Sequence, residues 1–202
     1  TWHVTGLSGS GSGDYRVKDA FVPEGRWLQM MDATPRIDGP TWRFPFYGML
    51  AIGIAAVSIG LLDGAVERFA ELAAIKKPEG SGRTLAERAS AQTVLSTSEA
   101  TARSARAFLH DAIGAAWLTA EAGTPLTTSH RRSLRLAACD ASQRCAEALV
   151  ALGREAGGTA VYLGEPLQRM VRDGQVAATH AMVAPRIHEL TGRLHLGLET
   201  DT

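Results

Sequence analysis

The stretch FYGMLAIGIAAVSIGLLDGAVERFAELAAIKKP, residues 46–78, decides the fold of this 202-residue chain. It has no charged side chain over Phe46–Leu62, and its helical pattern then continues without a break into Asp63. Two lysines and a proline follow Ile75, and cations and proline are typical of the end of a helix. The apolar run approaches the length that spans a membrane, but its continuation into charged positions favours burial in a protein core. The sequence therefore predicts a core helix over Phe46–Ile75.

Three more helices are expected after this one, separated by short turns. Their predicted ranges are Leu85–Ala122, Thr127–Ala156 and Glu165–Leu196. Thr127 lies where a helix N-cap is needed, and Pro185 is expected to kink or split the last helix. Four long helices joined by short connections form an antiparallel four-helix bundle. We therefore predict a mainly α fold.

The first part of the chain has a different pattern. Thr1–Thr5 and Tyr15–Val22 are strand-like, and the Gly/Ser run Gly6–Gly13 lies between them. A Gly/Ser run between two strands favours an ordered turn over a flexible linker. Two strands alone are not stable, so these are expected to need partner strands that this chain does not contain.

Composition excludes some classes of function. The chain has 21 basic and 21 acidic residues, which argues against a nucleic-acid-binding surface or a polybasic membrane anchor. Cys139 and Cys145 lie about 240° apart around a helix and cannot pair within it. Unpaired cysteines are typical of a reducing compartment, so we expect a cytoplasmic protein. His188 and His195 could share a helix face, but no third ligand is placed near them, so no metal site is expected.

Two segments could carry a binding site. Trp2 beside a tight polar turn suits a flat heterocycle, although a tryptophan packed on the bundle has the same pattern. The second segment runs from Gly157-Gly158 through Arg172-Asp173 to His180. A double glycine lets the backbone approach a ligand closely, and a continuing helix would place His180 on nearly the face of Arg172. The alternative for these residues is a helix cap with surface arginines and an ordinary histidine.

Together these segments resemble the C-terminal half of the acyl-CoA dehydrogenase superfamily, and most closely its flavin-dependent monooxygenase branch. Trp2–Ser12 and Val17–Pro23 are similar to the end of that family's middle β-domain, which often has Thr-Gly-Ser where this chain has Ser10-Gly11-Ser12. Gly82-Arg83 and Gln92 are similar to a segment that reaches the flavin of a neighbouring subunit. Gly157-Gly158 and Arg172-Asp173 match the last family signature.

The resemblance implies a domain boundary, an assembly and a cofactor. Residues 1–42 would be the end of the β-domain with its connecting loop, and residues 43–202 the helical domain. The protein would be a homotetramer that binds FMN or FAD between the β-domain and the bundles of two subunits. The implied flavin contacts are Trp2, Ser12, Arg83, Gln92, Gly157 and Gly158. The family also has an N-terminal helical domain, so the chain is expected to be a piece of a longer protein or a truncated relative that binds no flavin.

The two branches of the family differ in one catalytic residue. A dehydrogenase needs a carboxylate base to remove an α-proton, and neither family location, Gln175–Ile187 or Phe44–Ile59, contains one. The monooxygenase branch has a histidine near the position of His180, where it hydrogen-bonds the flavin or the substrate phenol. The sequence therefore predicts a two-component monooxygenase that hydroxylates a small aromatic or similar organic substrate, with reduced flavin from a separate reductase. An acyl-CoA dehydrogenase and a non-catalytic oligomerisation bundle remain the alternatives.

Overall fold

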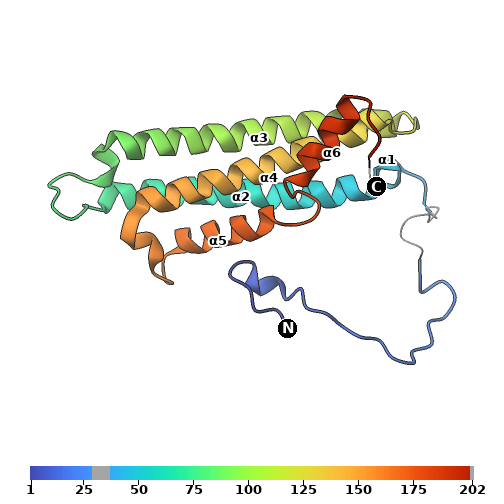
Figure 1. Ribbon diagram of the computed structural model, residues 1–202, viewed down its shortest axis with the longest axis horizontal. Helices are drawn as coiled ribbons and strands as arrows, with labels where there is room; N and C mark the ends of the chain where they lie inside the picture. Colours follow the sequence, from blue (N-terminus) through green and yellow to red (C-terminus); the bar gives the residue numbers. More distant parts are fainter. Residues whose placement is uncertain (29–36, 201–202) are drawn as a thin grey trace.

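The computed structural model describes residues 1–28 and 37–200, and its fold is the predicted helical bundle. The α-helices are α1 (Pro40–Arg43), α2 (Phe46–Ile75), α3 (Ala89–Glu121), α4 (Thr128–Ala156), α5 (Pro166–Ala178) and α6 (Arg186–His195). Short 3₁₀ turns are η1 (Ser8–Ser10), η2 (Leu85–Glu87) and η3 (Gly157–Val161). The helices α2, α3 and α4 run side by side along the molecule, α5 packs beside α2 and α4, and α6 lies against the other end of α4 (Figure 1).

Most helix boundaries agree with the prediction. Helix α2 has the predicted bounds, and Thr127 caps α4 by accepting a hydrogen bond from the His130 amide. The helix predicted over 165–196 is split, as expected, but the break begins at Thr179, well before Pro185. The amide of Thr179 bonds to the carbonyl of Val176, which tightens the end of α5 and stops the helix there.

Alanine and leucine side chains fill the core between the helices. Phe69, Leu62 and Leu149 are fully buried, and buried alanines on every long helix let the helix axes approach closely. Cys139 and Cys145 are free, as the sequence predicted, and both are buried. Burial raises the pKa of Cys139 to about 11 and that of Cys145 to about 12, so both stay as thiols at neutral pH.

Helix α2 is the one helix in the described ranges that is long and apolar enough to cross a membrane. It packs against α3, α4 and α5 as part of the bundle, and a third of its most apolar window is buried. Its other side leaves Met49, Leu50 and Val57 exposed. An exposed apolar face of this kind is typical of a surface that another domain or subunit covers.

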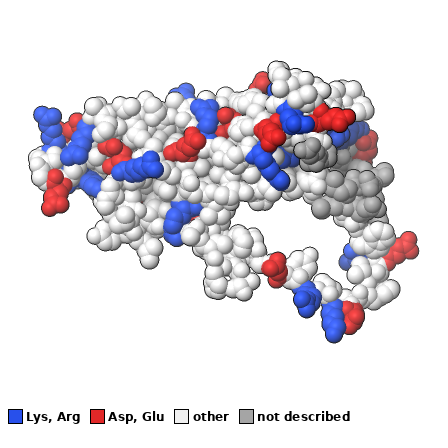
Figure 2. Space-filling view, in the orientation of Figure 1, with Lys and Arg blue, Asp and Glu red and all other residues white. Residues whose placement is uncertain are grey.

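The two predicted strands are not formed, which corrects the expectation for Thr1–Thr5 and Tyr15–Val22. No residue of 1–28 lies in a strand, and residues 11–28 are exposed, with Tyr15 and Phe21 about nine-tenths accessible. A strand needs a neighbouring strand for its backbone hydrogen bonds, and the described residues provide none. Figure 2 shows the segment of residues 11–28 separated from the bundle by an open space. Acidic and basic side chains are mixed on the face drawn there, without a single-sign patch.

Candidate functional site

The Arg172-Asp173 pair on α5 anchors the N-terminal segment to the bundle. The amide of Leu7 donates to Asp173 Oδ1 at 2.6 Å, and Arg172 Nη1 donates to the carbonyl of Thr5 at 2.7 Å. Gly6 lies directly on the helix backbone, where a Cβ would be 2.4 Å from the Arg172 carbonyl oxygen. Sequence reasoning left these residues as either a family signature or surface charges. In the structure, Arg172 and Asp173 hold the N-terminal segment against α5.

The Gly/Ser run forms the ordered turn that was predicted. Leu7 is its centre, because the indole Nε1 of Trp2 and the hydroxyl of Ser10 both donate to the Leu7 carbonyl, at 3.2 and 2.8 Å. The hydroxyls of Ser10 and Ser12 are 3.2 Å apart. Leu7 has φ 54°, a left-handed conformation that is uncommon for a residue with a side chain. Half-buried Trp2 and exposed Ser12 therefore lie on one hydrogen-bonded turn docked on α5.

Gly157 and Gly158 end α4 in a turn that a half-buried lysine supports. Gly157 has φ 61°, which favours glycine, and Lys76 Nζ donates to the Ala156 carbonyl and, at 2.7 Å, to Thr159 Oγ1. A Cβ at Gly158 would meet no described atom within 4 Å, so its backbone is open to a ligand. Sequence reasoning saw Lys76 as an end-of-helix cation and missed that it holds this turn.

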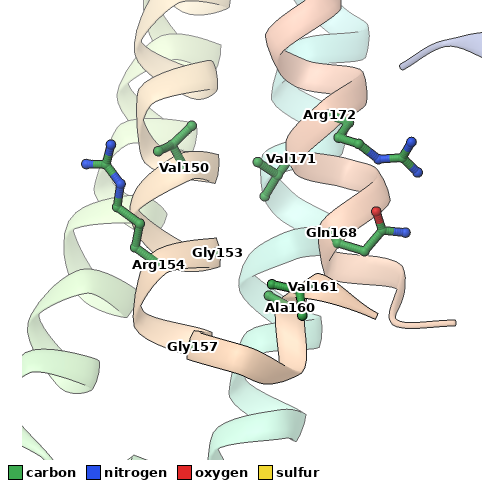
Figure 3. Close-up of a pocket in the computed structure, with 9 residues that line it drawn as sticks. All are labelled: Val150, Gly153, Arg154, Gly157, Ala160, Val161, Gln168, Val171 and Arg172. Carbon is green, nitrogen blue, oxygen red and sulfur yellow. The ribbon is translucent and has the colours of Figure 1, made fainter. Parts of the chain in front are cut away.

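A groove of about 520 Å³ lies between the end of α4, η3 and the first turns of α5. Val150 and Val171 face each other across it and Gly157 lies at one end, while the guanidinium groups of Arg154 and Arg172 point away from it on opposite sides (Figure 3). The groove thus has apolar walls, with positive charge at its outer margins. Such a surface fits a ligand whose flat apolar part enters the groove and whose anionic part stays at the margin.

Arg83 and Gln92 lie at the same end of the bundle as the glycine pair. Both are exposed, and Gln92 Nε2 donates to the Ala86 carbonyl at 3.0 Å. Ser90 joins the start of α3 to the end of α4 through a 2.6 Å hydrogen bond to Glu155. The predicted flavin contacts therefore form two groups. Arg83, Gln92, Gly157 and Gly158 gather at one end, while Trp2 and Ser12 lie on the turn docked farther along α5.

His180 is not on a continuing helix with Arg172, which corrects the sequence prediction. Helix α5 ends at Ala178, and His180 is exposed in the turn between α5 and α6. Its Nδ1 accepts a hydrogen bond from the Met182 amide at 3.2 Å. In the neutral imidazole the proton therefore lies on Nε2, so the hydrogen-bond donor of the ring is its Nε2–H. Within the described ranges, no cluster of His, Cys, Asp and Glu could hold a metal ion.

Replacing Lys76 by methionine is expected to loosen the glycine turn. The Ala156 carbonyl and Thr159 lose a charged donor, and the free energy of unfolding should fall by about 1 kcal/mol. Amide exchange over Gly157–Val161 should quicken in the same variant. Lys77→Met, at the exposed neighbouring position, is the control for urea unfolding and exchange. Equal effects of the two substitutions would contradict this role of Lys76.

Comparison with known proteins connects this geometry to a family. A family model described as acyl-CoA dehydrogenase, C-terminal domain, matches residues 52–185. The chain is 31% identical over 197 residues to indole-3-acetate monooxygenase of Pseudomonas putida, an alignment that covers 98% of this chain and 50% of that protein. It is 26% identical over 211 residues to the flavin-dependent monooxygenase oxygenase subunit HsaA of Rhodococcus jostii, covering 100% of this chain and 55% of that protein.

A solved structure matches the fold over the whole chain. XiaF from Streptomyces sp., in complex with FADH2 and glycerol, superposes with a TM-score of 0.88 at 26% identity, covering 100% of this chain and 53% of XiaF. The chain spans about half the length of the curated relatives it matches. The matched residues run from the core of α2 to the turn before α6, which includes the glycine pair and His180. The chain therefore belongs to the family of acyl-CoA dehydrogenase C-terminal domains.

Proposed function

We propose that this chain is the C-terminal half of the oxygenase in a two-component flavin-dependent monooxygenase that hydroxylates an aromatic or similar small organic substrate. One observation carries the proposal: the turn between α5 and α6 presents the Nε2–H of His180, and no carboxylate lies from Gln175 to Ile187. A hydrogen-bond donor there suits oxygen insertion, whereas proton abstraction from an acyl thioester needs a base. The likeness to indole-3-acetate monooxygenase over nearly the whole chain supports this reading over an acyl-CoA dehydrogenase.

The residues present fit a flavin. Arg154 and Arg172 offer positive charge beside the apolar groove, and the open backbone of Gly158 allows close approach. Trp2 provides an aromatic wall, and Ser12 a hydroxyl. XiaF, whose structure contains FADH2, makes FAD the proposed flavin, with FMN as the alternative. Bound reduced flavin supplies the electrons and activates O₂, while this chain binds, orients and shields the reactants.

A homotetramer is proposed because the candidate contacts form two groups within one chain. Arg83, Gln92 and the glycine pair would reach the flavin of a neighbouring subunit, while Trp2 and Ser12 would contact the flavin of their own. The exposed Met49, Leu50 and Val57 of α2 support such an assembly, because apolar surface is stabilised when it is covered. The proposal includes a separate flavin reductase as partner, since one relative is named as an oxygenase subunit. It also includes a cytoplasmic location, because both cysteines are free.

A flavin titration tests the cofactor. Reduced and oxidised FAD and FMN are added to the protein, and binding is followed by the visible flavin absorbance and by fluorescence quenching. Gly158→Val should weaken flavin binding about tenfold or more, because a side chain there blocks close approach of the backbone. Gly164→Val, also an exposed glycine with free space around it, is the matched control. Uptake of neither flavin would leave the non-catalytic bundle as the function.

A second experiment tests the reaction in the assembled oxygenase with its reductase. His180→Ala should retain flavin but lower hydroxylation about a hundredfold, with reduced flavin consumed to make hydrogen peroxide instead. His188→Ala, an exposed histidine on α6, is the control. Oxidation of an acyl-CoA at a rate that exceeds hydroxylation would favour the dehydrogenase alternative.

A further inference from the structure

Gln143 on α4 spans the break between α5 and α6. Its Nε2 donates to the Ala178 carbonyl at 2.8 Å and to the Val183 carbonyl at 2.9 Å. Ala178 is the last residue of α5, and Val183 is fully buried near the end of the following turn. One side-chain amide therefore uses both of its protons to hold the two ends of the turn at a fixed separation.

The same turn fixes the imidazole of His180. The His180 amide donates to the Ala177 carbonyl at 3.1 Å, and the Val183 amide donates to the His180 carbonyl at 2.9 Å. The Met182 amide donates to His180 Nδ1 at 3.2 Å. These hydrogen bonds can form only if residues 178–183 keep this backbone conformation. The orientation and tautomer of the ring thus depend on the segment that Gln143 holds.

Helix α4 supports the segment through a second side chain. Cys139, one helical turn before Gln143, donates from Sγ to the Val183 carbonyl at 3.2 Å. A thiol is a weak donor, and the Gln143 amide reaches the same oxygen with a stronger hydrogen bond. Gln143 also reaches the Ala178 carbonyl, which α5 leaves without a helical partner at its end. Gln143 is therefore the stronger of the two supports.

We propose that Gln143 is a positioning residue that holds the turn from Ala178 to Val183 and thereby keeps His180 as an Nε2–H donor facing the reaction. The inference rests on the proposed monooxygenase function for the task of His180. It adds a residue on α4 that the sequence pattern gave no reason to select. Gln143 touches neither flavin nor substrate in this account and acts through the turn.

The experiment compares Gln143→Met with Gln175→Met. Methionine matches glutamine in length and lacks the amide donors. Gln175 is the matched control, because its Nε2 also joins α5 to α4, through one 2.9 Å bond to the Ala146 carbonyl, away from the turn. In ¹⁵N-histidine NMR spectra, wild type and Gln175→Met should show His180 as the single Nε2–H tautomer. Gln143→Met should show both tautomers, and its Met182 and Val183 amides should exchange about tenfold faster.

A purely stabilising role would lower the unfolding midpoint and leave the His180 tautomer single, so that result overturns the inference. Gln143→Asn covers the case in which Gln143→Met does not fold, because the shorter amide keeps its chemistry but cannot reach both carbonyls. A single tautomer and unchanged exchange in Gln143→Asn overturn the inference in the same way.

Turnover separates this inference from the proposed function. In the assembled oxygenase, Gln143→Met should lower the hydroxylated product formed per reduced flavin about tenfold, with KM for the organic substrate unchanged. If the tautomer changes in Gln143→Met but His180→Ala hydroxylates normally, the positioning role stands and the monooxygenase proposal fails. If the tautomer does not change, the positioning role fails whatever the activity of His180→Ala.

Discussion

Replacing Gly6 by alanine is expected to detach residues 5–7 from helix α5. The new Cβ would lie 2.4 Å from the carbonyl oxygen and 2.6 Å from the carbonyl carbon of Arg172. Both are backbone atoms inside a helix, so they cannot move aside as a flexible side chain could. The N-terminal turn should separate from the helix, and the bonds from Leu7 to Asp173 and from Arg172 to Thr5 should break together.

Amide hydrogen exchange at Leu7 measures this effect directly. The Leu7 amide, which now donates to a carboxylate, should exchange about a hundredfold faster in Gly6→Ala. Gly9→Ala in the same turn is the matched control, because a Cβ there meets no described atom within 4 Å. If both variants protect Leu7 as well as wild type does, Gly6 does not determine the docking. Flavin binding should weaken in parallel, since Trp2 and Ser12 move with the turn.

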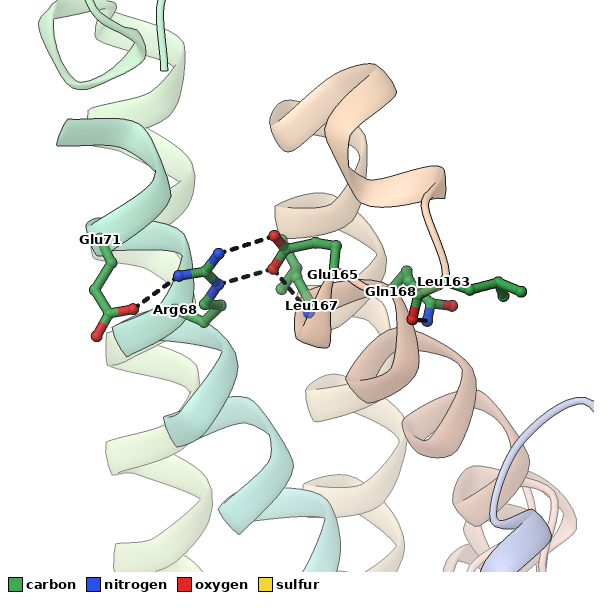
Figure 4. Close-up of polar contacts among 6 residues, drawn as sticks. All are labelled: Arg68, Glu71, Leu163, Glu165, Leu167 and Gln168. Atoms are coloured by element: carbon green, nitrogen blue, oxygen red, sulfur yellow. Dashed lines mark hydrogen bonds and ion pairs between the residues drawn. The ribbon is translucent and has the colours of Figure 1, made fainter. Parts of the chain in front are cut away.

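Replacing Glu165 by glutamine is expected to have the largest effect on stability. Glu165 is 8% exposed and forms a two-point ion pair with Arg68, at 2.8 and 2.9 Å, while it also caps α5 through the Leu167 amide (Figure 4). The side-chain amide of glutamine is uncharged, and its NH₂ group cannot accept a hydrogen bond from Arg68. The Arg68 guanidinium would therefore lose its main counter-charge. The free energy of unfolding should fall by about 2 kcal/mol, because Arg68 is 30% exposed and water relieves part of the loss.

The control for this experiment is the other carboxylate on the same arginine. Glu71 bonds to Arg68 at 3.0 Å but is 68% exposed, so Glu71→Gln should change stability by less than about 0.5 kcal/mol. Urea unfolding of both variants checks the difference. Similar losses of unfolding free energy in the two variants would show that burial of the Glu165 carboxylate does not strengthen its ion pair.

The same ion pair predicts a pH dependence. The hydrogen bonds from Arg68 hold the pKa of Glu165 below its usual value of 4.5. A carboxyl whose pKa is lower in the folded state stabilises the fold above its unfolded pKa, and this stabilisation is lost as pH falls through the folded pKa. The stability gap between wild type and Glu165→Gln should therefore be constant near neutral pH and shrink below about pH 4.5. A gap that stays constant into acid would contradict the assignment.

The sequence predicted the helices well because local signals define them. The charge-free run of α2, the cations and proline after Ile75, and the cap at Thr127 all act within a few residues. The strands failed for the opposite reason, since Thr1–Thr5 and Tyr15–Val22 have strand-like side chains but need partner strands, which the described residues do not provide. Secondary structure that depends on a distant neighbour is not encoded in a local pattern.

The sequence predicted the candidate contact residues of the site, but not the residues that hold them in place. Trp2, Gly157 and His180 could be selected from motifs, and their roles as flavin or substrate contacts remain predictions. Lys76 and Gln143 could not be selected, because a lysine near a helix end and a glutamine inside a helix have no distinctive spacing. Their tasks follow from hydrogen bonds between residues 80 and 40 positions apart in the chain. Such interactions become visible only when the helices are packed.

The anchor between the N-terminal turn and α5 also bears on the order in which the chain folds. Leu7 and Asp173 are 166 residues apart, so their bond closes a loop that contains most of this chain. The entropy cost of so long a closure is met most easily after α2, α3 and α4 have packed and α5 has formed on them. Docking of residues 5–7 is then expected to be the last step of folding and the first to reverse on unfolding. The turn that carries Trp2 and Ser12 is thus assembled on a completed bundle, and its attachment to α5 reports whether that bundle is intact.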